Sequence, residues 1–182
     1  SYVYLLEKEE FSKEITGHDG PSVFNPLPMN ELEDKLNIYS AVHEYTDAEG
    51  NYTYEYVGKG VFSKDGKVTK PIYDGGLPMN ADLAAVQKNG LWGYVDSNGN
   101  EVIPCQYQTI HTFQYNGYTS NYIYPALNNS IVLKNTDGYF GVVDYSGNTL
   151  LDFTYEWISP FTDGNVLVKT NNEWHIIDPF TQ

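Results

Sequence analysis

The stretch that decides the fold is Leu91-Trp-Gly-Tyr-Val-Asp96-Ser-Asn-Gly99-Asn-Glu-Val-Ile-Pro104. In its centre, the Asp96 side chain can accept hydrogen bonds within a turn, and Gly99 can supply the positive φ that a short hairpin loop requires. Pro104 cannot donate to a strand ladder, so it should end the returning strand or mark an edge or a bulge. The stretch therefore predicts a β-hairpin.

The same pattern recurs along the chain. Residues 60–73 read Gly-Val-Phe-Ser-Lys-Asp-Gly-Lys-Val-Thr-Lys-Pro-Ile-Tyr, and residues 141–155 read Gly-Val-Val-Asp-Tyr-Ser-Gly-Asn-Thr-Leu-Leu-Asp-Phe-Thr-Tyr. A fourth copy begins at Trp174-His-Ile-Ile-Asp178. The intervals between Gly60, Gly93, Gly141 and His175 are 33, 48 and 34 residues, which indicates a tandem unit of about 33 residues with one insertion. Units of this kind bury their faces by stacking on one another.

Residues 84–113 resemble the bacterial WG repeat, which is called after its Trp-Gly pair. The resemblance rests on Ala-Ala-Val, Asn-Gly, Trp-Gly, Asp-x-x-Gly and Val-Ile-Pro in that order. In the other copies Trp92 corresponds to Tyr139-Phe140 or to Lys59, and His175 replaces the glycine. The resemblance implies a repeat module that mediates binding. The residues that we expect to carry the repeat are Trp92, Gly93, Asp96, Gly99, Pro104, Gly141, Asp144, Gly147, Trp174 and Asp178.

The expected fold is all-β, with tandem hairpins or three-stranded units stacked in an open solenoid-like or propeller-like array. We expect an N-terminal cap and partial repeat over 1–40, followed by a repeat array over 41–182 with units near 41–74, 83–113, 130–161 and 166–182. Tyr2-Val-Tyr-Leu-Leu6 predicts a strand, and Asn30 before Glu33 predicts a short helix at 31–37, so one or two short helices at most lie near the N-terminus.

Composition excludes several classes of protein. The net charge is −14, and all ten basic residues are lysine, so nucleic acid and anionic lipid are poor partners. The mean hydropathy is −0.45 and no apolar run is long enough for a membrane-spanning helix. Cys105 is the single cysteine, which excludes an internal disulfide and a cysteine-based zinc site.

Motifs for catalysis or metal binding are weak. Asp96-Ser-Asn-Gly-Asn100 begins like an EF-hand loop but has Glu101 and Tyr107 where that loop needs Gly and Glu. The four histidines lack ligand spacing, and there is no Gly-x-Ser-x-Gly elbow. A packing role for Cys105 is favoured over a nucleophilic one, because no base is identifiable. We expect no catalytic residue, no metal and no cofactor.

The abundant tyrosines are the feature that could carry recognition. Tyr52, Tyr54 and Tyr56 alternate, so they should share one face of a hairpin whose other arm is 38–45. The insertion at 116–129 reads as a long polar-aromatic loop, and the tyrosines in or beside it are Tyr115, Tyr118, Tyr122 and Tyr124. These rings either pack against neighbouring strands or offer a stacking surface to a sugar or a peptide.

The leading hypothesis is a non-enzymatic bacterial binding or scaffold module for protein or surface ligands. The alternative is a glycan-binding module that uses the exposed tyrosines, and a more distant one is an acid-rich hydrolase. An extracellular or cell-surface location fits the low charge content, although a cytoplasmic one stays open. The sequence begins at Ser1 rather than Met, so we expect a processed form or a fragment attached to a larger chain.

Overall fold

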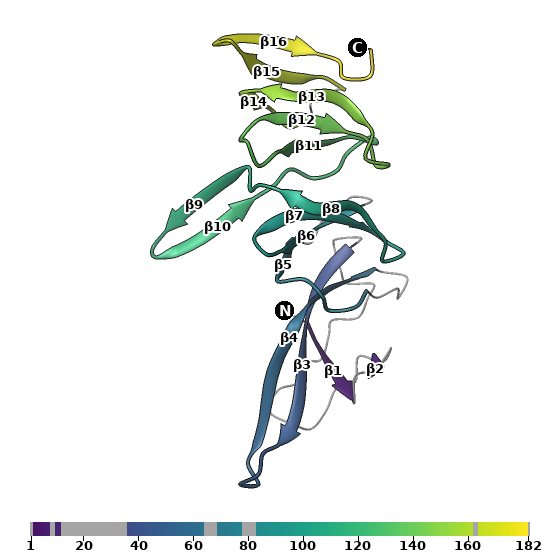
Figure 1. Cartoon of the computed structure of the whole chain (residues 1–182), viewed down its shortest axis with the longest axis vertical. Helices are drawn as coiled ribbons and strands as arrows, with labels where there is room; N and C mark the ends of the chain where they lie inside the picture. The colour runs from purple at the N-terminus through teal and green to yellow at the C-terminus, as the bar shows by residue number, and fades with distance from the viewer. Residues whose placement is uncertain are drawn as a thin grey trace. The chain divides into compact units, whose positions relative to one another are not determined.

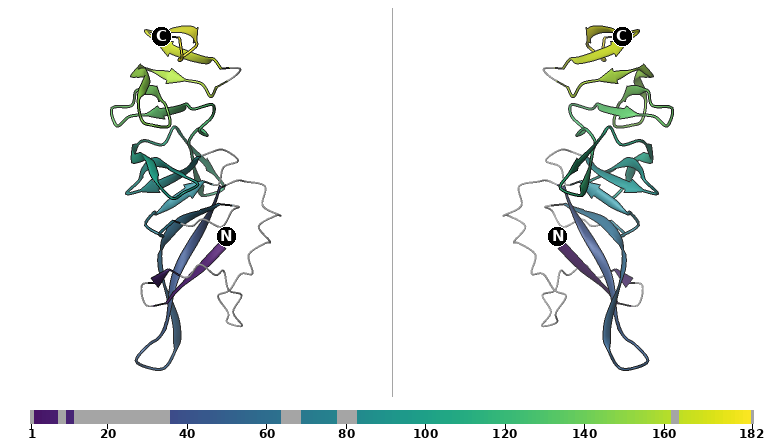
Figure 2. Two further views of the ribbon diagram at one scale, coloured as in Figure 1. Left: turned by 90° about the vertical axis from the view of Figure 1, so that its right-hand side faces the viewer. Right: turned by 90° about the vertical axis from the view of Figure 1, so that its left-hand side faces the viewer.

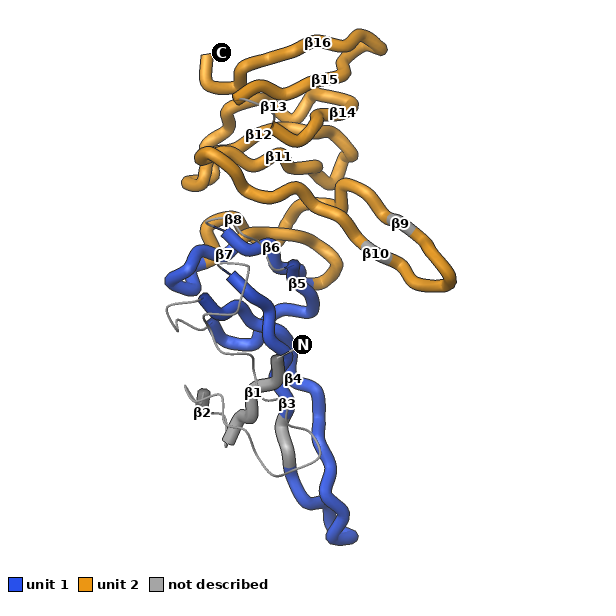
Figure 3. The backbone as a smooth tube through the Cα atoms, turned by 180° about the vertical axis from the view of Figure 1, so that it is seen from behind, with its two compact units in different colours: residues 1–88, 95–100 blue, residues 89–94, 101–182 orange. Residues whose placement is uncertain are grey.

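The computed structural model of the chain describes residues 2–7, 10–11, 36–63, 69–77, 83–161 and 164–181 (Figures 1 and 2). They fall into two compact units, one made of residues 1–88 and 95–100 and the other of residues 89–94 and 101–182 (Figure 3).

The first sheet belongs to the N-terminal part of the chain and has the strand order β2-β1-β3-β4. Its strands are β1 (Tyr2–Glu7), β2 (Glu10–Phe11), β3 (Leu36–Thr46) and β4 (Tyr52–Ser63). β1 runs parallel to β3, and the other pairs are antiparallel. The predicted hairpin between β3 and β4 is confirmed, with Leu36 opposite Ser63 and Thr46 opposite Tyr52. Residues 31–35 of the predicted helix lie outside the described residues, and Leu36 and Asn37 belong to β3.

The remaining strands form three small sheets and one two-stranded hairpin. The sheet orders are β5-β6-β7-β8, β11-β12-β13 and β14-β15-β16, and the hairpin is β9-β10. Their bounds are β5 (Gly75–Leu77), β6 (Leu83–Lys88), β7 (Leu91–Asp96), β8 (Glu101–Tyr107), β9 (His111–Tyr115), β10 (Tyr118–Tyr122), β11 (Ile131–Lys134), β12 (Phe140–Val143), β13 (Thr149–Tyr155), β14 (Trp157–Ile158), β15 (Val166–Thr170) and β16 (Glu173–Ile177).

Each complete repeat is a three-stranded meander. A first strand such as β6 or β11 is followed by a tight turn, by the strand that carries the Trp-Gly position, by the Asp-x-x-Gly turn, and by a third strand such as β8 or β13. Pro104 lies within β8, at the edge of its sheet, which was one of the predicted placements.

The same backbone hydrogen bond joins successive repeats. The backbone N–H of the residue at the end of one repeat donates to a carbonyl near the end of the first strand of the next repeat. The donor and acceptor residues are Asp74 and Gln87 (2.8 Å), Gln108 and Lys134 (2.8 Å), and Glu156 and Lys169 (2.9 Å). At the first and last of these junctions a short strand extends the pairing, because β5 pairs with β6 and β14 pairs with β15. The periodicity of the sequence is therefore a periodicity of backbone pairing.

The core is made mainly of the first and second strands of the complete repeats. All four residues of β12 are buried, as are Trp92–Val95 of β7, so these strands are covered on both faces. Near-continuous apolar runs suit such strands, because alternation with polar residues needs one solvated face. The buried aromatic residues of this core include Tyr39, Phe62, Trp92, Tyr94 and Phe140.

The predicted all-β repeat array is confirmed. The residues that the structure describes contain a series of small, mostly antiparallel sheets and no helix. Among them, no helix of the length and apolarity that crossing a membrane demands is found.

One prediction about the fold is wrong. The segment 116–129 is not a long loop, because Tyr118–Tyr122 form β10 and pair with β9 around Asn116-Gly117. Both turn residues have positive φ (49° and 81°), which is the geometry of a two-residue type I′ hairpin loop. After β10 the chain returns to the core, where Ile123 and Tyr124 are buried.

Candidate binding hairpins and the repeat signature

The aspartates of the repeat close one recurring turn. In each copy one carboxylate oxygen accepts from the backbone N–H groups two and four residues ahead, and the other accepts from an Asn side chain. The distances are 3.0, 2.8 and 3.1 Å for Asp47, 2.9, 2.8 and 3.0 Å for Asp96, and 2.9, 2.8 and 2.9 Å for Asp144. The glycine three residues after each Asp has a φ of 83° to 87°. Asp96, Gly99, Asp144 and Gly147 thus have the predicted turn-forming role.

Hydrogen bonding at these turns lowers the pKa of each aspartate. For Asp47 the backbone N–H of Asn51 is the main cause of the lowered pKa, and for Asp144 it is the side-chain amide of Asn148. Burial acts to raise the pKa of Asp96, but hydrogen bonds from Asn100 and Asn98 outweigh it and the net shift is downwards. These carboxylates are held ionised by their own turn, which is a structural use of the charge.

Gly93 and Gly141 occupy the same kind of site. A Cβ on Gly93 would lie 2.4 Å from the Ile103 carbonyl oxygen and 2.7 Å from the Cys105 nitrogen. At Gly141 it would lie 2.7 Å from the Phe153 ring and 2.9 Å from the Leu151 carbonyl oxygen. The third strand bulges here, since Phe140 pairs with Tyr155 while Val142 pairs with Leu151. The glycine of the Trp-Gly pair is therefore required by close backbone approach, not by a positive φ.

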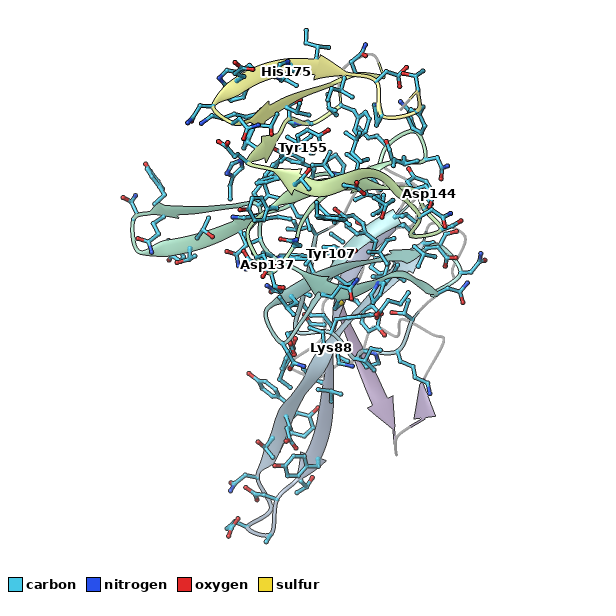
Figure 4. All side chains as sticks on the ribbon, turned by 45° about the horizontal axis from the view of Figure 1, so that its top comes forward. Lys88, Tyr107, Asp137, Asp144, Tyr155 and His175 are labelled. Carbon is cyan, nitrogen blue, oxygen red and sulfur yellow. The ribbon has the colours of Figure 1, made fainter. Side chains whose placement is uncertain are left out.

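The Trp-Gly position of the last repeat differs. Trp92 is buried at 3% exposure and its indole N–H donates to the Thr109 hydroxyl at 2.9 Å. Trp174 is 55% exposed and packs edge-on against Trp157, with a centroid distance of 5.6 Å. His175 lies at the glycine position of β16, where Figure 4 labels it. Asp178 again closes a turn, since its carboxylate accepts from the Phe180 N–H at 2.9 Å.

The first hairpin that bears tyrosines is the outer half of β3–β4. Tyr52, Tyr54 and Tyr56 alternate along β4 and are all exposed, Tyr54 at 62%. A bulge follows, because Ala41 pairs with Gly58 and Val42 pairs with Tyr56. The three rings therefore precede the bulge and share one face, as predicted from their spacing.

The second such hairpin is β9–β10. Tyr115 and Tyr118 flank its turn at 77% and 80% exposure, and they are opposite each other in the register. Figure 1 shows this hairpin extending away from the sheet of β11, β12 and β13. Tyr122 lies at its base, 42% exposed, and its ring stacks on His111 with a centroid distance of 6.4 Å.

Tyr124 is a candidate that the structure corrects. It was predicted as a ligand-binding ring, but it is only 3% exposed, and its backbone carbonyl accepts the buried Tyr94 hydroxyl. Burial raises the pKa of Tyr124 to about 12 and raises that of Tyr94 still further. Both phenols therefore stay neutral and pack the base of the β9–β10 hairpin.

Two features escaped the sequence reasoning. The turn Asp47-Ala-Glu-Gly-Asn51 is a copy of Asp96-Ser-Asn-Gly-Asn100 that the repeat search did not include, although the shared Asp-x-x-Gly-Asn pattern could have shown it. The exposure of Ile176 in β16 was also missed, because the apolar residues of this strand resemble those of strands that are buried in other repeats. The described residues contain no group of three or more His, Cys, Asp or Glu that could hold a metal ion.

Comparison with known proteins agrees with this geometry. The family described as WG containing repeat matches residues 60–92, 92–120 and 140–174, which together span more than half of the 182 residues. Neither the curated proteins nor the solved structures contain a match to the chain. The repeated turns, the crowded glycines and these three matched segments show that the chain belongs to the WG containing repeat family.

Proposed function

We propose that this repeat module is a non-enzymatic binding or scaffold domain that contacts a protein partner through its two tyrosine-bearing hairpins. The observation that carries the proposal is the concentration of exposed rings on the outer half of β3–β4 and on β9–β10. A two-stranded ribbon is marginal by itself in water, and exposed rings there gain most when a partner covers them.

Tyrosine suits such a surface. It supplies a large contact area while only two side-chain torsions become ordered, and it is enriched among the residues that dominate binding energy at protein interfaces. Asp47, Asp96 and Asp144 are engaged by their own turns, so these acidic residues support a structural role and not the catalytic role of a hydrolase.

The test uses the wild-type chain and two variants as baits, and it compares how tightly each form binds the proteins that are captured. The first variant carries Tyr115→Ser and Tyr118→Ser, and the control carries Tyr139→Ser, which removes another exposed tyrosine outside the hairpins. We expect a specific captured protein whose affinity falls at least about tenfold in the first variant, or about 1.4 kcal/mol, and stays unchanged in the control. Equal affinity of all three forms for every captured protein would contradict the proposal.

A glycan ligand is the second candidate, because Tyr52, Tyr54 and Tyr56 are exposed on one face of β4 at every second residue, a spacing of about 7 Å along an extended strand. Rings spaced in this way can each stack on a sugar. Adding a cell-wall or plant polysaccharide should then quench tyrosine emission, and the response should be lost in a Tyr52→Ala/Tyr54→Ala variant. The absence of quenching with every polysaccharide tested would remove this candidate.

A further inference from the structure

The two tyrosine-bearing hairpins differ in charge. The outer half of β3–β4, residues 42–57, contains four acidic residues and no lysine or arginine, so its formal net charge is −4; the acidic residues are Glu44, Asp47, Glu49 and Glu55. The β9–β10 hairpin, residues 111–122, contains no acidic residue, no lysine and no arginine. The two surfaces therefore share their exposed rings but not their electrostatic field, and they suit different partners.

The acidic hairpin is a two-stranded ribbon. β1 pairs with β3 only from Tyr39 to Val42, and beyond Val42 the strands β3 and β4 pair with each other alone, among the strands that the structure describes. Figure 1 shows the two strands continuing past the end of β1. The face that carries Tyr52, Tyr54 and Tyr56 is left to solvent, and each of these side chains is at least half exposed.

A carboxylate lies at each end of this row of tyrosines. At the turn, Asp47 accepts from the backbone N–H of Asn51 at 2.8 Å, directly before Tyr52, and that bond above all holds the pKa of Asp47 low. At the other end, burial raises the pKa of Tyr56, and the negative charge of Asp74, which is exposed, raises it further. A cation that reaches the row therefore meets rings along it and a carboxylate at both ends.

The hairpin supplies no cation of its own to these rings. Elsewhere the chain does so, since Lys134 Nζ lies 5.7 Å from the centroid of the Phe140 ring, its register partner on the next strand. No lysine lies within residues 42–57, and Lys59, beyond the bulge, donates from its Nζ to the Ser40 hydroxyl at 2.9 Å. The tyrosine row is thus an aromatic surface in a negative field that a cation from outside can occupy.

The spacing of the rings fits an extended chain. Alternate residues of a strand lie about 7 Å apart, so every second side chain of an extended peptide along β4 can reach one ring. Arginine suits these positions, because its guanidinium group is weakly hydrated, stacks on aromatic rings and pairs with carboxylates. A second copy of the hairpin would bring the same negative charge and be repelled, and a neutral sugar gains nothing from the field.

We propose that the outer half of β3–β4 binds an extended segment of another protein with arginine at every second residue. The guanidinium groups of the segment lie over Tyr52, Tyr54 and Tyr56, and those at its two ends lie close to Asp47 and Asp74. The inference rests on the proposed function, because it names the kind of partner that one of the two hairpins takes. It assigns no such partner to β9–β10.

The test uses the whole chain and the synthetic peptide acetyl-RSRSRSR-amide, labelled for fluorescence anisotropy. One control peptide has lysine in place of each arginine, and the other has citrulline, which keeps the planar shape of arginine without its charge. We expect the citrulline peptide to bind at least about tenfold more weakly at low salt, with a smaller difference at high salt. The arginine peptide should bind about threefold more tightly than the lysine peptide.

Variants at the rings separate stacking from general attraction to a negative protein. The Tyr52→Ser/Tyr54→Ser/Tyr56→Ser variant keeps every charge and, with three rings lost, should bind the arginine peptide at least about tenfold more weakly. Phe at the same three positions keeps the rings and should bind within about twofold of the wild type. The matched control, Tyr115→Ser/Tyr118→Ser in the uncharged hairpin, should bind as the wild type does.

Variants at the carboxylates separate the field of the hairpin from the charge of the whole chain. Glu49→Gln/Glu55→Gln removes two negative charges from the hairpin and leaves the Asp47 turn intact, so binding at low salt should weaken at least about threefold. Asp137→Asn/Asp152→Asn removes two exposed charges from the other compact unit and is the matched control. This control should change the affinity by less than about 1.5-fold.

Three results would overturn the inference. They are equal binding of the arginine and citrulline peptides, an unchanged affinity of the variant with three serines, and equal losses in the two carboxylate variants, since binding would then follow total charge alone. A captured protein that needs Tyr115 and Tyr118, without binding of the arginine peptide, would leave the proposed function standing and remove this inference alone. If neither hairpin affected the capture of any protein, and the peptide did not bind, both would be contradicted.

Discussion

β7 and β16 have the same place in two repeats but different surroundings. Each follows a two-residue turn and carries tryptophan as its second residue, yet Trp92 is buried and Trp174 is exposed. The difference arises because β8 covers β7, whereas β16 has no such neighbour among the described strands. In this fold the burial of a strand is set by the strand that follows it, as much as by its own residues.

Substituting the two tryptophans gives the largest expected contrast. Trp92→Ala leaves a cavity and removes the partner of the Thr109 hydroxyl, so we expect a loss of about 3–5 kcal/mol in the free energy of unfolding. Trp174→Ala removes a half-exposed ring, and the loss should stay below about 1 kcal/mol. Urea denaturation of both variants measures this, and equal losses would show that β16 is covered in solution.

Substitutions at the glycine position of the Trp-Gly pair should give the next largest contrast in the free energy of unfolding. The new methyl group of Gly93→Ala meets backbone atoms of β8 that cannot rotate away, so we expect a loss of about 2–3 kcal/mol. His175→Ala meets no such restriction and should change stability by less than about 0.5 kcal/mol. The same unfolding experiment compares them. A neutral Gly93→Ala would mean that the third strand does not approach β7 as closely as the structure shows.

A smaller contrast separates the two turns around β12. Asn135 accepts the backbone N–H of Tyr139 at 2.9 Å, as Asp144 accepts that of Asn148 at 2.8 Å, but only the aspartate titrates. Because folding lowers the pKa of Asp144, its contribution is present above its unfolded pKa and is lost as the pH falls through the folded pKa. The loss of stability should therefore begin below about pH 5.

Asp144→Asn, which copies Asn135, should keep the turn and remove this dependence on pH. We expect the urea midpoint of the wild type to fall more steeply between about pH 5 and pH 2 than that of the variant. Asp144→Ala is the control that loses the acceptor and should be less stable at neutral pH. Parallel curves for wild type and Asp144→Asn would contradict the assigned role.

The smallest expected effect concerns the turns before β7 and β16. Asn89-Gly90 and Asn171-Asn172 both have positive φ at both residues, but glycine adopts the second position with less strain than asparagine. Asn172→Gly should therefore raise the free energy of unfolding by a few tenths of a kcal/mol. The backbone N–H of Asn172 donates to the Glu156 carboxylate at 3.2 Å, and glycine keeps that bond. Thermal unfolding would measure the change, and a clear destabilisation would show that the Asn172 side chain contributes to the turn.

Much of the fold could be predicted from local signals. Asp96, Gly99, Asp144 and Gly147 form the expected turns because the Asp-x-x-Gly pattern satisfies its own hydrogen bonds within five residues. The alternation of Tyr52, Tyr54 and Tyr56 likewise predicts a shared face, since strand periodicity needs no knowledge of distant residues.

Other features depend on contacts that are distant in sequence. The insertion at 116–129 was expected to be a loop because it is polar, but its Asn-Gly pair nucleates the β9–β10 hairpin. Tyr124 resembles its exposed neighbours in sequence, but in the folded chain it is buried and its carbonyl accepts the hydroxyl of Tyr94, thirty residues away. The crowding at Gly93 also depends on β8, which no local pattern describes.

The sequence by itself determined the repeat, its turns and its all-β class, because periodic glycines and aspartates fix the backbone over a few residues. The tertiary structure alone decided which tyrosines are exposed and why the Trp-Gly glycine is needed. The physical reason is that turn geometry is satisfied locally, whereas burial and strand pairing are properties of neighbours that the chain brings together only on folding.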